Sequence, residues 1–432
     1  MKKLLQNLAL MFGGIVIALL VLEAGLRLFP GKLNMYNSTL TYQSDAGTGY
    51  RYVAGGPYRS AMACYDVMVR TNALGFRDES WTGKPVDLAF LGDSFMAALE
   101  VPDGENLPAL VGRLTGTSVM NTGISGYGTV VQELVFDRYV APVTPGLVVL
   151  FFVDNDVWNN SCELTRRFTG SNPGACMEKK DGIWQTAPGT ARAEPGRTRL
   201  KALTKKYCQI CTAVYNMVRN PHLLEVGAPS AEELVFRNGA FLREPGREWQ
   251  EAWEATDLAL GRLQEKITQA GSELLVVPVP HSGDGALLEQ VRAVVGPGDF
   301  HPQFAAQRLR TILEKHGIAS LDLRDGYRRY RKRHNLPDPG LHYWCDGHWN
   351  SLGHFAGASL LAGQLAATGR LPVSAAERSS VKQAARENLR MAPGELLGEA
   401  ALEEIFSPGG VFRGRTTLLE RMELPGRRGL AH

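Results

Sequence analysis

The sequence predicts an α/β protein built on a doubly wound parallel sheet. Short apolar segments alternate along the chain with longer amphipathic segments, which is the pattern of strands followed by crossover helices. Several of the apolar segments stop abruptly at small or amide residues, as strands do where they reach the carboxyl edge of a sheet. The 432 residues, 44% of them hydrophobic, are enough to bury one enlarged core.

The individual elements can be predicted in chain order. We expect strands at residues 86–91, 118–121, 147–153, 273–279 and 320–323, because these short, mostly apolar segments alternate with the predicted helices. We expect helices at residues 105–114, 130–140, 249–270, 302–316 and 351–368. Because parallel strands end at the same edge, the residues that follow them are expected to meet in one crevice.

The flanking segments give the domain organisation. Residues 1–30 are expected to be a membrane anchor or signal segment, and residues 31–85 form a lead-in rich in Tyr, Gly and Asn. The α/β domain is expected over residues 86–372, with an insertion at about 157–248 where Pro, Gly and Cys interrupt the strand-helix alternation. Residues 373–432 form a charged C-terminal extension, interpreted as peripheral helices or a partly ordered tail.

The first 30 residues indicate where in the cell the protein is located. Two lysines precede an uncharged apolar run over residues 8–22, and apolar character continues to residue 29. A helix over residues 4–29 is long enough to cross a bilayer at about 1.5 Å per residue, although the strict run is shorter than a span of about twenty residues. The positive-inside rule then leaves the remaining chain on the periplasmic or cell-surface side. We expect an uncleaved transmembrane anchor, with a cleaved signal peptide as the alternative.

Composition narrows the range of partners and compartments. The formal net charge of +3 is small for this length and gives no reason to expect nucleic acid as a partner. Six cysteines agree with an oxidising compartment. The pairings considered are Cys162 with Cys176, Cys64 with Cys345, and Cys208 with Cys211, among fifteen that six cysteines allow. No second pair or nearby histidine makes Cys208 and Cys211 a convincing metal site, and a redox role is the alternative.

Ser94 is the first candidate for chemistry. It follows Gly92 and Asp93 at the end of a predicted buried strand, where glycine permits a sharp turn. A serine at such a strand-to-helix turn exposes its hydroxyl at the edge of the sheet where ligands bind. A helix cap is the ordinary structural alternative.

Further polar residues are candidates to assist a serine nucleophile. Asp346 and His348 are two residues apart, so in an extended segment both side chains point to the same side. A carboxylate there can orient the imidazole as a base for Ser94. Gly126 and Asn155 follow two other predicted strands, where a backbone amide and a side-chain amide can stabilise an oxyanion. The alternatives are a loop bend, a turn residue and a surface histidine near the last helix.

Taken in this order, the four segments resemble the SGNH hydrolases, also called GDSL esterases and lipases, over about residues 86–366. The resemblance implies a flavodoxin-like sheet, with Ser94 as nucleophile, His348 as general base and Asp346 as its partner. It also implies an oxyanion hole formed by the Ser94 amide, the Gly126 amide and the Asn155 side chain. Many members space the acid and histidine as Asp-x-x-His, whereas the Asp-x-His-Trp of this chain is similar to the branch containing polysaccharide O-acetyltransferases and exported acyl esterases.

These observations together predict a serine esterase acting on acyl groups, such as O-acetyl esters of cell-envelope carbohydrate. The expected partners are an acylated small molecule or glycan, and a membrane through the N-terminal helix; no metal or organic cofactor is needed for acyl transfer. One alternative is an O-acyltransferase that moves the acyl group to a glycan hydroxyl, and another is a non-catalytic carbohydrate-binding or assembly protein. Arg77 and His281 could each approach the crevice or have a structural role.

Overall fold

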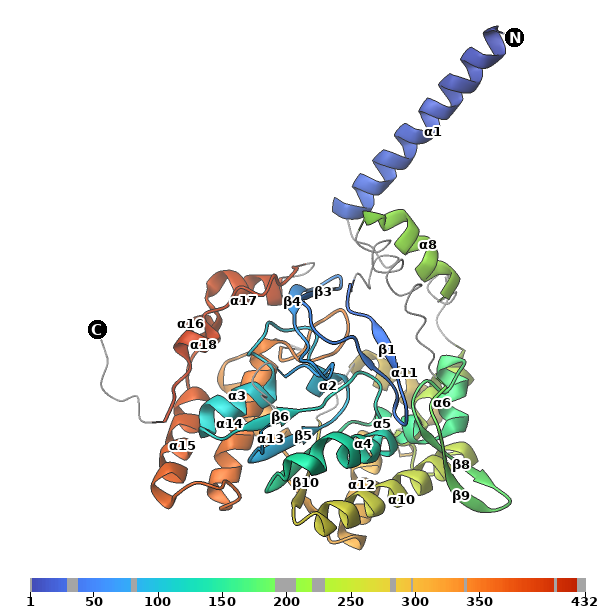
Figure 1. Cartoon of the computed structure of the whole chain (residues 1–432). Helices are drawn as coiled ribbons and strands as arrows, with labels where there is room; N and C mark the ends of the chain where they lie inside the picture. Colours follow the sequence, from blue (N-terminus) through green and yellow to red (C-terminus); the bar gives the residue numbers. More distant parts are fainter. Residues whose placement is uncertain are drawn as a thin grey trace, which may run out of the picture.

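The structure is a computed structural model (Figure 1). It describes residues 2–28, 38–78, 84–190, 207–219, 230–279, 285–296, 298–337, 340–407 and 410–425. His281 lies outside these ranges.

A parallel sheet forms the centre of the molecule. Its five strands have the order β11-β10-β7-β5-β6. Their bounds are β5 Leu88–Leu91, β6 Val119–Asn121, β7 Leu147–Phe152, β10 Glu273–Pro278 and β11 Ala319–Ser320. Numbered within the sheet, this is the flavodoxin-like order 2-1-3-4-5, so the predicted doubly wound parallel sheet is confirmed. The strand order reverses between β5 and β7, and the chain leaves these two strands at Gly92 and Val153.

Helices cover both faces of the sheet (Figure 1). One face packs against α4 (Thr129–Val135), α10 (Arg247–Gln269) and α12 (Pro302–Lys315). The other packs against α3 (Leu107–Thr115), α14 (Ser351–Ala367) and α15 (Ala375–Asn388). Side chains of β7 alternate between the two hydrophobic clusters, since Leu150 belongs to the first and Val149 and Phe151 to the second. All six residues of β7 are buried, as expected of a central parallel strand.

The predicted helices form with small shifts at their ends. Asn106 and Asn350 cap α3 and α14, each accepting a hydrogen bond from a backbone amide three residues later. The predicted helix 130–140 changes at its middle, because α4 continues as a π-helical turn over Phe136–Val140. The sequence patterns did not predict α13 (Arg324–Arg333), whose ten residues include six arginines and lysines and few apolar ones.

The remaining elements lie in the lead-in, the insertion and the C-terminal extension. The lead-in contains two hairpins, β1 (Tyr42–Asp45) with β2 (Gly49–Tyr52) and β3 (Tyr58–Ala61) with β4 (Asp66–Val69). Between β5 and β11 lie α2 (Ser94–Ala97), α5 (Asn155–Asn160), α6 (Cys162–Thr169), β8 (Cys176–Lys180), β9 (Ile183–Ala187), α8 (Gln209–Arg219), α9 (Ala231–Arg237) and α11 (Gly285–Val295), with 3-10 turns at Ala141–Val143 and Gly239–Phe241. After α15 come α16 (Pro393–Leu397), α17 (Glu399–Phe406) and α18 (Leu418–Arg421).

The C-terminal extension is part of the folded domain as far as the structure describes it. Leu397, Ile405 and Phe412 are buried in the same cluster as α14. Phe412 also pairs with the lead-in, since its backbone amide donates to the carbonyl of Cys64. The charged composition of this segment therefore belongs to the outer faces of packed helices.

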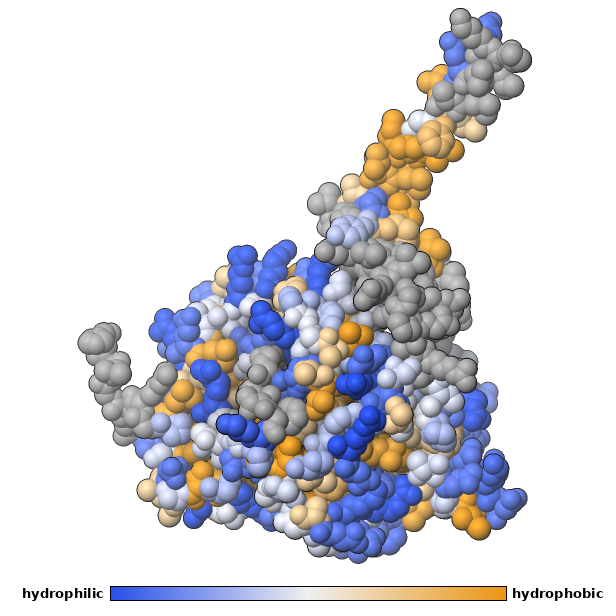
Figure 2. Space-filling model, in the orientation of Figure 1, coloured by the Kyte–Doolittle hydropathy of each residue, from blue (hydrophilic) through white to orange (hydrophobic). Residues whose placement is uncertain are grey.

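The N-terminal helix α1 (Lys2–Leu28) projects from the body of the molecule beside α8 (Figure 1). Hydrophobic residues gather along its middle (Figure 2), where Phe12, Ile17 and Val21 are 69%, 64% and 66% exposed. Among the helices in the described ranges, none is long and apolar enough to cross a membrane. Glu23, near the end of α1, accepts hydrogen bonds from the amides of Gln209 and Ile210 at the start of α8.

All three cysteine pairs that the sequence suggested form disulfides. Cys162 and Cys176 join α6 to β8 across 14 residues, while Cys208 and Cys211 are joined at the start of α8. The third disulfide joins Cys64 to Cys345, which are 281 positions apart in the sequence. This last bridge attaches the lead-in to the segment that precedes α14.

Candidate active site

Ser94 is the first residue of α2, directly after the end of β5 and the turn at Gly92. Asp93 caps the short helix by accepting a hydrogen bond from the Phe95 amide at 3.0 Å. A Cβ at Gly92 would lie 2.5 Å from the Met96 side chain, so a glycine is required for this tight turn. The turn leaves the Ser94 side chain partly exposed at the carboxyl edge of the sheet.

His348 lies on a short hairpin that precedes α14, and its imidazole contacts Ser94. Nε2 of His348 is 2.8 Å from Oγ of Ser94, which is hydrogen-bond distance for a base and its nucleophile. Two backbone bonds shape the hairpin: the Tyr343 amide donates to the His348 carbonyl and the Gly347 amide to the Tyr343 carbonyl. Gly347 has φ +76°, a conformation that glycine adopts without strain. The structure therefore joins two residues that are 254 positions apart.

Asp346 holds the hairpin and lies beside the other imidazole nitrogen. Its Oδ1 accepts a hydrogen bond from the His348 backbone amide at 3.0 Å, and its Oδ2 is 3.2 Å from Nδ1 of His348. The second contact is within ion-pair distance, but within the described part of the chain Nδ1 has no partner with hydrogen-bond alignment. The arrangement is that of a Ser-His-Asp triad whose acid-to-imidazole bond is not yet well aligned.

A second carboxylate, Glu100, approaches the same nitrogen. Its Oε1 is 3.6 Å from Nδ1 of His348, and its side chain is only 7% exposed. Burial raises the pKa of Glu100 to about 7, with the Asp346 charge adding to the effect and the His348 charge opposing it. Burial lowers the pKa of His348, but the charges of Glu100 and Asp346 outweigh this and raise it to about 10. The two carboxylates therefore favour the protonated form of the His348 imidazole.

Arg77 holds the turn that contains Glu100 through contacts with the residues that follow it. This fully buried guanidinium donates to the carbonyl of Val101 at 2.5 Å and lies 3.6 Å from Asp103. Of the two alternatives for Arg77, approach to the crevice or a structural role, these contacts favour the structural role. The Glu100 carbonyl also accepts a hydrogen bond from the Tyr343 hydroxyl at 3.2 Å, which ties this turn to the His348 hairpin.

Asn155 reaches the nucleophile turn from the end of β7. Its Nδ2 donates to Asp93 at 2.9 Å and to Asn159 at 3.2 Å. Both amide protons are thus engaged in this arrangement, and one must turn from its present acceptor to reach an oxyanion. Burial raises the pKa of Asp93, while its bonds from Phe95 and Asn155 oppose that shift.

Gly126 lies on the loop that follows β6, and this loop packs against the nucleophile turn. The Asn121 side chain donates to the Met96 carbonyl at 2.8 Å and accepts from the Gly123 amide. A Cβ at Gly123 would lie 2.6 Å from the Ala97 amide, so the two loops approach backbone to backbone. Gly126 itself has φ +81°, and a Cβ there would come within 2.8 Å of the Tyr50 hydroxyl.

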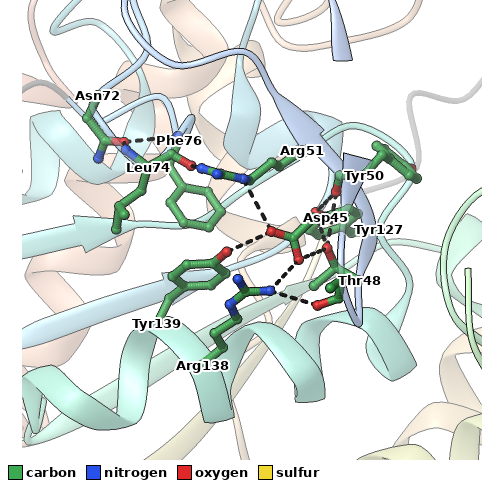
Figure 3. A network of polar contacts seen from close by, with 11 residues as sticks. Asp45, Thr48, Tyr50, Arg51, Asn72, Leu74, Phe76, Tyr127, Arg138 and Tyr139 are labelled. Carbon is green, nitrogen blue, oxygen red and sulfur yellow. Dashed lines mark hydrogen bonds and ion pairs between the residues drawn. The ribbon is translucent and has the colours of Figure 1, made fainter. Parts of the chain in front are cut away.

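The β1–β2 hairpin of the lead-in packs against the Gly126 loop and supports it. The sequence analysis did not predict this contact. The hydroxyl of Tyr50 donates to the Ser125 carbonyl, and the hydroxyl of Tyr52 contacts both the amide and Oγ of Ser125. Asp45 holds this hairpin against the π-helical turn through Arg138 at 2.8 Å and Tyr139 at 2.9 Å (Figure 3). Only the three-dimensional pairing reveals this support, since the tyrosines are more than 70 positions from Ser125.

Among the described residues, one cluster of this site could also hold a metal ion. One ligand atom each from Glu100, Asp346 and His348 lies within 4.8 Å of the others. A divalent cation bound there would occupy Nδ1, leaving Nε2 facing Ser94.

No family model and no curated protein matches this chain. The fold is similar to an alpha/beta hydrolase enzyme from the metagenome of Lake Arreo, Spain, at 15% identity over 68% of this chain and 100% of that chain, with a TM-score of 0.34. It is also similar to a catalytic mutant of an acetylxylan esterase from Geobacillus stearothermophilus, at 13% identity over 65% and 94%, TM-score 0.34. A GDSL-like lipase from Bacteroides thetaiotaomicron shares 10% identity over 65% and 88%, TM-score 0.30. Similarity at this level carries no argument about function.

Proposed function

We propose that this protein is a serine esterase of the SGNH type that cleaves small acyl esters through an acyl-enzyme on Ser94. The observation that carries the proposal is the 2.8 Å contact between the Ser94 hydroxyl and Nε2 of His348. Carboxylates at 3.2 Å and 3.6 Å from the opposite nitrogen complete the charge arrangement that stabilises an imidazolium during catalysis.

The mechanism follows from these positions. Neutral His348 removes the proton as Ser94 Oγ bonds to the ester carbonyl carbon, and the carbonyl becomes an oxyanion. The amides of Ser94 and Gly126 and the side chain of Asn155 are the proposed donors to that oxyanion. The carbon–oxygen bond to the alcohol then breaks, and His348 returns the proton to the departing alcohol. Water attacks the acyl-enzyme by the same route and releases the acid.

The proposed substrate class is an O-acetyl ester of cell-envelope carbohydrate. The Asp-x-His-Trp spacing at residues 346–349 supports this class, because it resembles exported enzymes that act on polysaccharide acyl groups. The same spacing supports a second candidate, an O-acyltransferase in which a glycan hydroxyl replaces water. The close approach of His348 to Ser94 argues against a purely non-catalytic binding protein.

The proposed location is extracytoplasmic, on the periplasmic or cell-surface side. Three disulfides use all six cysteines, which is typical of a chain that folds in an oxidising compartment. Thiol labelling of the protein recovered directly from its native cells tests this location. Unreactive cysteines without reductant support it, and six reactive thiols contradict it.

Hydrolysis of p-nitrophenyl acetate tests the esterase proposal. The purified chain is expected to release p-nitrophenol, and S94A is expected to release it at the rate of buffer alone. Equal activity of the two proteins would contradict the proposal. Incubation with an acetylated donor and a glycan then separates the two candidates, since acetylated glycan indicates transfer and free acetate alone indicates hydrolysis.

A further inference from the structure

A pocket of about 280 Å³ lies between α13 and α15, and none of its lining residues belongs to the candidate active site. Its lining residues are Gly326, Arg329, Tyr330, Arg333, Leu360, Arg386, Leu389 and Arg390. The two helices are fastened at this point, because Arg333 donates to the Leu389 carbonyl at 3.3 Å and His334 contacts the same carbonyl at 3.2 Å. The pocket is thus built on regular helices joined by side-chain bonds.

Four of the residues lining this pocket are arginines, and no acid lines it among the described residues. Arg329, Arg386 and Arg390 form no side-chain hydrogen bond or ion pair with the part of the chain that the structure describes. Two acids on the same helices have partners outside the pocket: Asp325 pairs with Arg328, and Glu387 accepts a hydrogen bond from Gln383. The positive charge in the pocket is therefore not balanced by the carboxylates of α13 and α15.

The four arginines are exposed, and their spacing brings like charges together on each helix. Arg329 and Arg333 are four residues apart on α13, and Arg386 and Arg390 are four apart on α15. Like charges at this spacing repel each other on a helix surface. Arginine forks also match the oxygens of phosphate in a bidentate manner. A multivalent oxyanion would relieve the repulsion and use the forks.

Tyr330, which also lines the pocket, is buried beside His334. Tyr330 is 3% exposed, and its hydroxyl has no hydrogen-bond partner among the described residues. A buried hydroxyl without a partner is unfavourable, so such groups are normally satisfied by protein, water or ligand. Its ring packs 4.6 Å from the His334 ring, which fixes the hydroxyl in place. Because the hydroxyl oxygen is inaccessible to solvent, the contacts to a bound anion are assigned to the arginines alone.

We propose that this pocket binds a phosphate-type oxyanion, held by the four arginines. The cavity has room for one phosphoryl group with a small substituent and not for an extended polymer. The proposal does not depend on the esterase function, because none of its residues belongs to the candidate active site. Free phosphate and the headgroup of an anionic phospholipid share this chemistry, and the experiment distinguishes them.

Isothermal titration of the whole chain with inorganic phosphate and with pyrophosphate tests the proposal. We expect saturable binding that the double variant R386Q/R390Q weakens by about tenfold or more, since charge-assisted bonds are lost. The double variant R247Q/R421Q is the matched control, because it removes two exposed arginines from α10 and α18 and should change affinity less than about twofold. Tyr330→Phe keeps the buried ring and should change affinity less than about twofold, because the hydroxyl does not reach the cavity.

Flotation with phosphatidylglycerol vesicles forms the second arm, with phosphatidylcholine vesicles as the reference. Binding of phosphate alone indicates a soluble anion, and added flotation that R386Q/R390Q abolishes indicates a lipid headgroup; either outcome supports the pocket. Absence of saturable binding to both probes would overturn the proposal. Equal losses in R386Q/R390Q and R247Q/R421Q would also overturn it, since only general charge would then be at work.

Discussion

The turn after β5 and the hairpin before α14 supply the two halves of the candidate active site, but they are held in different ways. Ser94 follows directly from a buried central strand, and its turn is shaped by a local cap and by glycine. His348 depends on distant contacts, namely the disulfide from Cys64 to Cys345 and the bond from Tyr343 to the Glu100 carbonyl. The nucleophile is therefore positioned by the sheet, whereas the base is positioned by attachments from elsewhere in the chain.

Loss of either half should have the largest effect. S94A and H348A should each lower kcat for p-nitrophenyl acetate by about 10⁴-fold or more, because nucleophile and base act as a unit. For the same reason the double variant should lose no more than either single variant. Steady-state kinetics measure this, and additive losses in the double variant would show that the two residues act independently.

Asn155 tests how far the nucleophile turn depends on its neighbour at the end of β7. N155A should lower kcat by about 10²–10³-fold with little change in KM, as expected for a donor to the oxyanion. N159A is the matched control, because it frees one proton of Asn155 without removing the amide, and it should lower kcat less than tenfold. A change confined to KM in N155A would exclude the oxyanion role.

The disulfide between Cys64 and Cys345 tests the attachment of the base directly. C64S/C345S should lower kcat by about tenfold and the free energy of unfolding by about 2–5 kcal/mol, because a long loop is released. C162S/C176S should lower stability without a comparable loss of kcat, since that bridge joins α6 to β8. Denaturant unfolding and kinetics of both variants provide the comparison. If both retain full kcat, the bridge does not position His348.

Glu100 gives the smallest but most specific effect, a shift in the pH profile. His348 must be neutral to act as a base, so activity should rise with pH as its raised pKa of about 10 is approached. Near that pH Glu100 is ionised, because its pKa is about 7. Removing this charge in E100Q lowers the pKa of His348, and the rise in kcat/KM should move to lower pH by about one unit.

The control for this shift is another buried glutamate. Glu105 accepts hydrogen bonds from Ser351 and Thr416 and makes no contact with His348. E105Q should therefore leave the pH profile in place even if it lowers stability. An unshifted profile in E100Q would mean that Glu100 is already neutral across the rise.

Sequence reasoning located the residues whose positions follow from local rules. Ser94 and Asn155 stand directly after apolar strands, and the spacing of Asp346 and His348 indicates a shared side in an extended segment. Glu100 was not predicted as a site residue. Its turn depends on Ala98 at φ +48°, a conformation that no sequence pattern of this chain predicts. The contact of Tyr50 with the Gly126 loop was also not predicted, because it joins residues that are far apart in the sequence and leaves no local pattern. The transmembrane expectation for residues 1–30 rests on apolar composition and stays a prediction.

Covalent labelling with a fluorophosphonate, followed by mass spectrometry of the digested protein, is the most direct test that Ser94 is a nucleophile activated by His348. The wild-type chain should gain one phosphonyl adduct, on the peptide that contains Ser94, and H348A should gain it far more slowly. Unlabelled Ser94 in the folded protein, or labelling at the same rate in H348A, would contradict the account.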